Sequence, residues 1–184
     1  MMDDSTKKEL QQAFIAALRE AKNNCDGLFV AMVIDRNDLL GGYLAKIKLS
    51  LVNNTDTHYP HISLLTGACT GDEDFFMETG KAVFGPYDLG PRSTVSMPES
   101  DVGELDFLVW YQFDITDKAG KTEQYITALP KYEYEPTGLP LLDIPGMRLD
   151  LDKRDGISIA EYVKTKGLKE KYIKYNGDGT ETVS

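Results

Sequence analysis

Cysteine is scarce in this chain, which contains only Cys25 and Cys69 among its 184 residues. The two do not form a C-x-x-C pair, and two cysteines are too few for the disulfide framework that holds small secreted domains together. Free thiols in a reducing compartment are the simplest interpretation. A single disulfide between the two residues is the alternative.

Long apolar runs are also missing. No run approaches the roughly 18 residues that a membrane-spanning helix needs. The first ten residues, MMDDSTKKEL, lack the apolar segment of a signal peptide. The sequence therefore predicts a cytoplasmic protein with no membrane partner.

The motifs of common catalytic machinery do not occur. There is no G-x-S-x-G turn for a serine nucleophile, and neither the P-loop pattern nor the dinucleotide pattern G-x-G-x-x-G is present. Carboxylates are plentiful, but sequence spacing alone does not identify an acid–base pair among them. These absences favour a protein that is not an enzyme.

Positive charge is in the minority, with 20 lysines and arginines against 30 aspartates and glutamates, which gives a formal charge of −10. Such a surface repels phosphate backbones, so the charge balance argues against nucleic acid as a partner. It is suited instead to a basic protein partner.

The strongest pattern that is present is a β-hairpin within residues 105–129. Apolar and aromatic residues alternate along its first half at Phe107, Val109, Tyr111, Phe113 and Ile115. The turn sequence Asp-Lys-Ala-Gly follows at 117–120, and a second strand-like run comes after it. This pattern predicts two antiparallel strands with one face in the core.

Shorter strand-like runs precede the hairpin at 28–35, 43–52, 62–65 and 93–97, with turn residues between them. The order of a strand, an N-x-T turn at 53–55, a strand, the segment L-G-P-x-S at 89–93, a strand and the hairpin is similar to immunoglobulin-like domains. The resemblance covers residues 43–129, and the Cys–Trp–Cys spacing of antibody domains is absent. We expect a mainly β fold, an antiparallel immunoglobulin-like β-sandwich over 28–134, within a single domain of residues 1–184.

A helix is expected on each side of the sandwich. Residues 5–23 place apolar side chains at helical spacing after a capping box of Thr6 and Glu9. Residues 157–175 show a similar stripe that begins at Ile159. Between the sandwich and the second of these helices, residues 135–156 are rich in proline and glycine. They predict an extended segment that lies over the body of the domain.

Four aromatic residues are candidates for contact with a ligand or partner: Trp110, Tyr125, Tyr132 and Tyr134. Trp110 faces opposite the Val109–Tyr111–Phe113 row, so one of these two rows belongs to the core. An exposed Trp110 would mark a binding surface. The alternative, which we favour, is that a terminal helix covers it.

Residues 150–161 partly match a calcium-binding EF-hand loop. Asp150, Asp152 and Glu161 stand at positions 1, 3 and 12 of the motif. Arg154 stands at position 5, where an oxygen ligand is needed, and the glycine comes one place late. These three carboxylates are the candidate calcium ligands, and the alternative is the acidic start of a helix.

His58 and His61 are the only histidines, and they suggest a third type of function, a metal-dependent enzyme. A metal site needs three or four ligands, and no third ligand lies nearby in the sequence. The leading hypothesis is a non-catalytic protein-binding module, such as an acidic inhibitor or immunity-type protein for a basic partner. A carbohydrate- or ligand-binding accessory domain is the second hypothesis.

Overall fold

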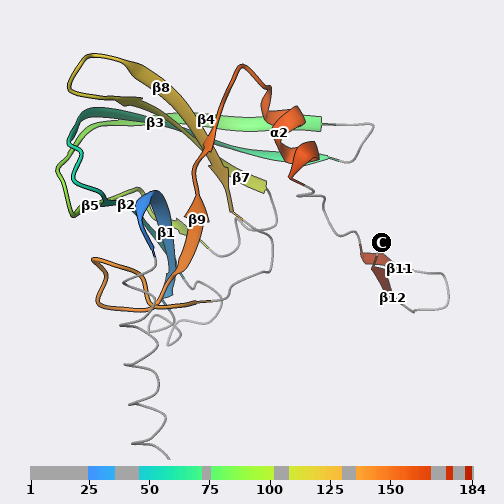
Figure 1. Cartoon of the computed structure of the whole chain (residues 1–184). Coiled ribbons are helices and arrows are strands. Elements are labelled where there is room, and N and C mark those ends of the chain that lie inside the picture. Colours follow the sequence, from blue (N-terminus) through green and yellow to red (C-terminus); the bar gives the residue numbers. More distant parts are fainter. Residues whose placement is uncertain are drawn as a thin grey trace, which may run out of the picture.

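The computed structural model describes residues 25–35, 46–71, 76–101, 108–129, 136–166, 173–175 and 181–183. These residues form a mainly β structure with two antiparallel sheets (Figure 1). The predicted helix at 5–23 lies outside the described residues. Within the described ranges, no helix has the length and apolar character needed to cross a membrane.

The first sheet has the strand order β5-β2-β1-β9, with the short strand β6 also paired to β2. Its members are β1 (Gly27–Asp35), β2 (Lys46–Asn54), β5 (Ser93–Ser96), β6 (Ser100–Asp101) and β9 (Met147–Asp150). The hairpin of β1 and β2 pairs Gly27 with Asn54 and Asp35 with Lys46. This agrees with the strands predicted at 28–35 and 43–52.

The second sheet has the order β10-β8-β7-β3-β4. Its members are β3 (Tyr59–Gly71), β4 (Phe76–Leu89), β7 (Leu108–Thr116), β8 (Thr122–Ala128) and β10 (Asp152–Lys153). The predicted hairpin is confirmed, since β7 and β8 pair antiparallel from Trp110–Ala128 to Thr116–Thr122. Its turn is closed by the amide of Gly120, which donates to the carbonyl of Asp117.

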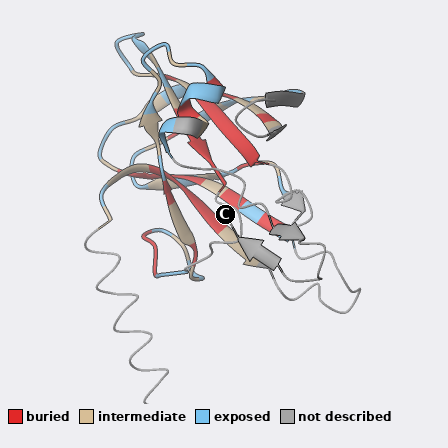
Figure 2. Ribbon diagram, turned by 90° about the vertical axis from the view of Figure 1, so that its right-hand side faces the viewer, coloured by how far each residue is buried: buried red, intermediate tan, exposed pale blue. Residues whose placement is uncertain are grey.

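The two sheets share one hydrophobic core. Strands of the first sheet contribute Val30, Met32 and Leu49, and β7 contributes Tyr111 and Phe113. Figure 2 shows these strands largely in the colour of buried residues. Because side chains alternate between the two faces of a strand, the row 109–115 of β7 faces this core and the row that contains Trp110 faces away.

Two smaller apolar clusters cover the outer faces of the sheets. On the second sheet, the helix α2 (Ile159–Thr165) packs on Trp110 and Ile126. On the first sheet, Leu139 packs on Phe29. Trp110 is therefore a core residue with 1% of its surface exposed, and the alternative in which a helix covers it is the one that agrees with the structure.

Three expectations about chain segments need correction. The helix expected over 157–175 spans only Ile159–Thr165, and Ile173–Tyr175 is a strand, β11, paired with β12 (Glu181–Val183). The segment 135–156 contains regular structure. Strand β9 pairs with β1 of the first sheet, and β10 pairs with β8 of the second sheet. Backbone pairing with β1 and β8 prevails there over the local proline and glycine content. The β-structure thus continues beyond residue 134.

Candidate functional site

Residues 140–145 form a loop, here called the apolar loop, at the outer side of the first sheet. Its base is closed by two backbone hydrogen bonds between Thr137 and Gly146, with N···O distances of 2.8 and 2.9 Å. The loop follows strand β8 in the chain and leads directly into β9, as Figure 1 shows. The end of the loop is therefore held by the first sheet, and the Thr137–Gly146 bonds tie the start of the loop to that end.

The base of the apolar loop is packed tightly on strand β1. Leu139 is 1% exposed and lies in a cluster with Phe29, and Pro140 is also buried. A Cβ atom on Gly146 would lie 2.9 Å from the carbonyl oxygen of Met32 and 3.0 Å from a methyl group of Val33. Only glycine allows the chain to approach β1 this closely.

The tip of the apolar loop exposes two large apolar side chains. Leu141 is 41% exposed and Ile144 is 54% exposed. Leu141 also has a φ of 64°, in the left-handed region. That conformation costs a residue other than glycine roughly 1–2 kcal/mol, and a partly exposed leucine offers less burial to offset this cost than a core leucine does. The loop therefore holds an exposed apolar residue in a strained but fixed conformation, which is typical of a preformed contact surface.

Arg148 orders the charged groups on strand β9, next to the loop. Its Nη1 donates to the Sγ of Cys25 at 3.0 Å, and its Nε donates to Asp150 at 2.6 Å. Its guanidinium also lies 4.7 Å from the ring centre of Phe29. Asp150 compensates the positive charge of Arg148. Asp26 and Asp143 are exposed, and their carboxylates therefore add net negative charge near the loop.

The three predicted calcium ligands are not brought together. Asp150 pairs with Arg148, Asp152 accepts hydrogen bonds from Tyr162 and Lys166, and Glu161 accepts bonds from the amide and hydroxyl of Ser158. Across the part of the chain that the structure describes, no three histidine, cysteine, aspartate or glutamate side chains converge. The reciprocal bonds of Ser158 and Glu161 form a capping box, which is the alternative considered for this motif.

The two histidines lie in different surroundings. His58 Nε2 lies 2.5 Å from Asp88, so it joins the start of β3 to the end of β4. His61 is exposed and pairs through its backbone with Thr116 of β7. The structure does not place the two side chains in a shared group of three ligands within the described residues.

The predicted aromatic contact residues do not form a platform. Trp110 is buried, and Tyr125 is half-buried, packs against the shared core and donates its hydroxyl to Glu123. Tyr132 and Tyr134 lie outside the described residues. The candidate contact residues that the sequence did not single out are Leu141 and Ile144. Their apolar character is visible in the sequence, but nothing in the sequence marks these two as exposed.

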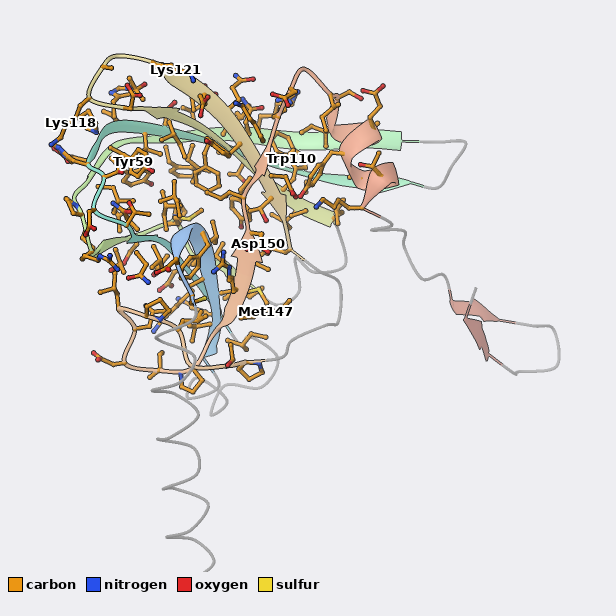
Figure 3. All side chains as sticks on the ribbon, viewed as in Figure 1. Tyr59, Trp110, Lys118, Lys121, Met147 and Asp150 are labelled. Atoms are coloured by element: carbon orange, nitrogen blue, oxygen red, sulfur yellow. The ribbon has the colours of Figure 1, made fainter. Side chains whose placement is uncertain are left out.

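A charged network surrounds Glu123 on strand β8. Lys121, Lys153 and Tyr125 donate hydrogen bonds to its carboxylate at 2.7, 3.0 and 2.9 Å. These bonds lower the pKa of Glu123 to about 2. Burial, followed by the bond to Glu123, raises the pKa of Tyr125 to about 12. Figure 3 places Lys121 at one end of the molecule, near Lys118 of the β7–β8 turn.

Acid should weaken the fold through this network. A carboxyl group with a lowered pKa in the folded state stabilises the protein above its ordinary pKa of 4.5, and this contribution is lost as the pH falls towards 2. We expect Glu123→Gln to flatten the decline in the free energy of unfolding over that range, as measured by urea denaturation at several pH values. Glu99→Gln is the control, since the pair that Glu99 makes among the described residues is an exposed one, with Lys46 at 3.5 Å. Parallel curves of the free energy of unfolding against pH for wild type and Glu123→Gln would contradict this role of Glu123.

The described surface thus offers one fixed, exposed apolar loop with negative charge nearby, and it offers no assembled set of metal ligands in those residues. Such a loop can be inserted into an apolar depression on another protein. Comparison of the chain with protein-family models, with curated proteins and with solved structures gives no match.

Proposed function

We propose that this chain is a non-catalytic protein-binding module that presents Leu141 and Ile144 of the apolar loop to a partner. The observation that carries the proposal is the backbone of Leu141. Leu141 combines a φ of 64° with a side chain that the fold leaves 41% exposed. Strained residues that the surrounding structure holds in place cluster at binding sites and catalytic sites.

The rigid base of the loop supports a binding role. The Thr137–Gly146 bridge and the buried Leu139 fix the loop before any partner arrives. A preformed loop loses less conformational entropy on binding than a flexible one. Apolar side chains of this kind fill pockets on protein surfaces, whereas sugar-binding sites rely on exposed aromatic rings, and Trp110 is 1% exposed.

The partner we propose is basic. The chain carries a formal charge of −10, and Asp143 stands within the loop between the two exposed apolar residues. Opposite charges would speed the encounter of the two proteins and would make the association rate fall with increasing ionic strength. An acidic inhibitor or immunity-type protein is the narrower form of this proposal.

We also propose that the body is an immunoglobulin-like sandwich. In such domains the first, second and fifth strands pair in one sheet, and the third strand pairs with the last hairpin in the other. The pairings β1–β2, β2–β5, β3–β7 and β7–β8 support this arrangement. Strand β4 pairs with β3, in the position of the additional strand of variable-type domains. The apolar loop then follows the last strand of the sandwich.

The substitution Leu141→Gly tests the function. Glycine adopts a positive φ without strain, so we expect the melting temperature to stay within about 3 °C of wild type. The same change removes the exposed side chain, and we expect binding to the captured partner to weaken about 10-fold or more. Partners are identified by quantitative capture on the immobilised wild-type chain, and their affinities for each variant are then measured.

Val83→Ser is the matched control, because Val83 is an exposed apolar residue of strand β4, outside the loop, with 73% of its surface exposed. It should retain binding, and Ile144→Ser should weaken it. If every captured protein binds Leu141→Gly as tightly as wild type, the apolar loop is not the interface. If no captured protein distinguishes the chain from an unrelated acidic protein, the proposed function itself fails.

A further inference from the structure

We propose that helix α2 is a lid over the outer face of the second sheet, and that it opens while the two sheets stay folded. The lid lies on the opposite sheet from the apolar loop and does not depend on the binding function proposed for that loop. Figure 1 shows α2 as a single short helix against the sheet that contains β7 and β8. The inference rests on how this helix is attached.

The helix is held by few side chains. It spans seven residues, and two of them, Ile159 and Tyr162, are 5% and 4% exposed. Both pack on a patch of the sheet formed by Leu108, Trp110, Ile126 and Ala128, and the partly buried Val163 and Ile157 pack against the same cluster. A helix this short is not stable on its own in water. Its order therefore depends on contact with the sheet, whereas the sheet is also held by the core on its other face.

The polar attachments of the helix converge on Asp152. One carboxylate oxygen accepts the hydroxyl of Tyr162 at 2.8 Å, and the other accepts the ammonium of Lys166 at 2.8 Å. Asp152 is thus a latch that joins α2 to strand β10. Tyr162 takes part in both the polar and the apolar attachments. Breaking its hydrogen bond to Asp152 therefore also weakens the packing of its ring on the sheet.

The connection between β10 and α2 contains a hinge. Arg154 is fixed to the second sheet, because its amide donates to Gln124 at 2.8 Å and its guanidinium donates to Gln112. Two residues later, Gly156 has a φ of 81°. Glycine moves between backbone regions at low cost. The chain can therefore turn at Gly156 while Arg154 stays on the sheet, and this turn breaks the bond from Nε of Arg154 to the carbonyl of Ile157 at 2.9 Å.

The closed state also leaves a polar group without a partner. The indole N–H of Trp110 is buried under the lid and has no hydrogen-bond acceptor in the described part of the structure. A buried donor without an acceptor favours any state in which water reaches it. In the open state this N–H would be hydrated, and the apolar face would extend through Leu65 to Val83 at the edge strand β4.

Hydrogen exchange on the full-length chain tests the lid. Trp110 is the only tryptophan, so its indole proton gives a single resolved signal. We expect this proton and the amides of Tyr162 and Lys166 to exchange at least about 10-fold faster than the paired amides of β7 and β8, as local opening predicts. Asp152→Ala should accelerate the first group further, by roughly 10-fold, and should leave the strand amides unchanged.

Asp150→Ala is the matched control, because Asp150 lies two residues away, pairs with Arg148 and does not touch α2. This variant should change neither the exchange rates of the indole proton and the α2 amides nor those of the strand amides. Tyr162→Phe removes the latch bond but keeps the ring, so it reports on opening even if Asp152→Ala fails to fold. The proposal that α2 is a lid is contradicted if the indole proton, the α2 amides and the strand amides exchange at one common rate in the wild type. It is also wrong if Tyr162→Phe leaves the exchange of α2 and the indole unchanged.

Discussion

Replacing Trp110 by alanine is expected to lower the free energy of unfolding by about 3–5 kcal/mol. Trp110 is the largest fully buried side chain, and it lies between strand β7 and helix α2. Alanine would leave a cavity on the sheet and would remove most of the surface on which Ile159 and Tyr162 pack. Urea denaturation followed by far-ultraviolet circular dichroism measures the change.

Val83→Ala is the control for this substitution. Val83 stands on the same outer face of the second sheet, but 73% of its surface is exposed, so its truncation should change stability by no more than about 0.5 kcal/mol. A loss below about 1 kcal/mol for Trp110→Ala would mean that the patch under α2 can collapse onto itself. It would also mean that the helix contributes less to the fold than its burial of Trp110 indicates.

The hairpin of β7 and β8 was predictable because its signals are local. Alternation along one strand, a turn of four suitable residues and a second strand all fall within 25 residues, and the register follows from the turn. The strands β1 and β2 were also predictable, from the apolar runs that form them. The burial of both faces of β7 could be stated only as an alternative, because helix α2 comes about 50 residues after Trp110 in the chain.

Strand β9 and the end of β2 could not be predicted in the same way. Met147–Asp150 follows a proline–glycine pair, and its strand conformation depends on pairing with β1, more than 100 residues earlier. Asn53 and Asn54 read as a turn, yet they end strand β2 and are buried. In both places distant partners decide the local structure, and local propensity is a weak guide.

The candidate site was even less accessible to sequence reasoning. Leu139, Leu141 and Ile144 are similar side chains spaced within six residues, and only the backbone path shows that the first is buried and the others are exposed. A positive φ at a leucine has no signature in the sequence, because such positions usually hold glycine or asparagine. The three predicted calcium ligands show the same limit: Asp150, Asp152 and Glu161 lie close in the chain, but in the structure each has a partner of its own.

The substitution Asn53→Ala should destabilise the protein by about 3 kcal/mol, since it removes four hydrogen bonds that contribute about 0.5–1.5 kcal/mol each. The Asn53 side chain is fully buried, and its amide donates to the carbonyls of Thr57 and Gly90 at 2.7 Å each. Its oxygen accepts from the amide and hydroxyl of Thr55 at 3.1 and 2.6 Å. Asn53 therefore joins the β2–β3 connection to the end of β4. Alanine would remove the side-chain donor from the carbonyl of Thr57, whereas the carbonyl of Gly90 would keep the hydroxyl of Ser93 at 2.6 Å. Asp56→Ala in the same connection is the control, because within the described ranges this exposed carboxylate pairs with Arg92, and such a pair should contribute no more than about 1 kcal/mol. Equal melting temperatures for the two variants would show that water replaces the asparagine, and that the connection is held by its backbone alone.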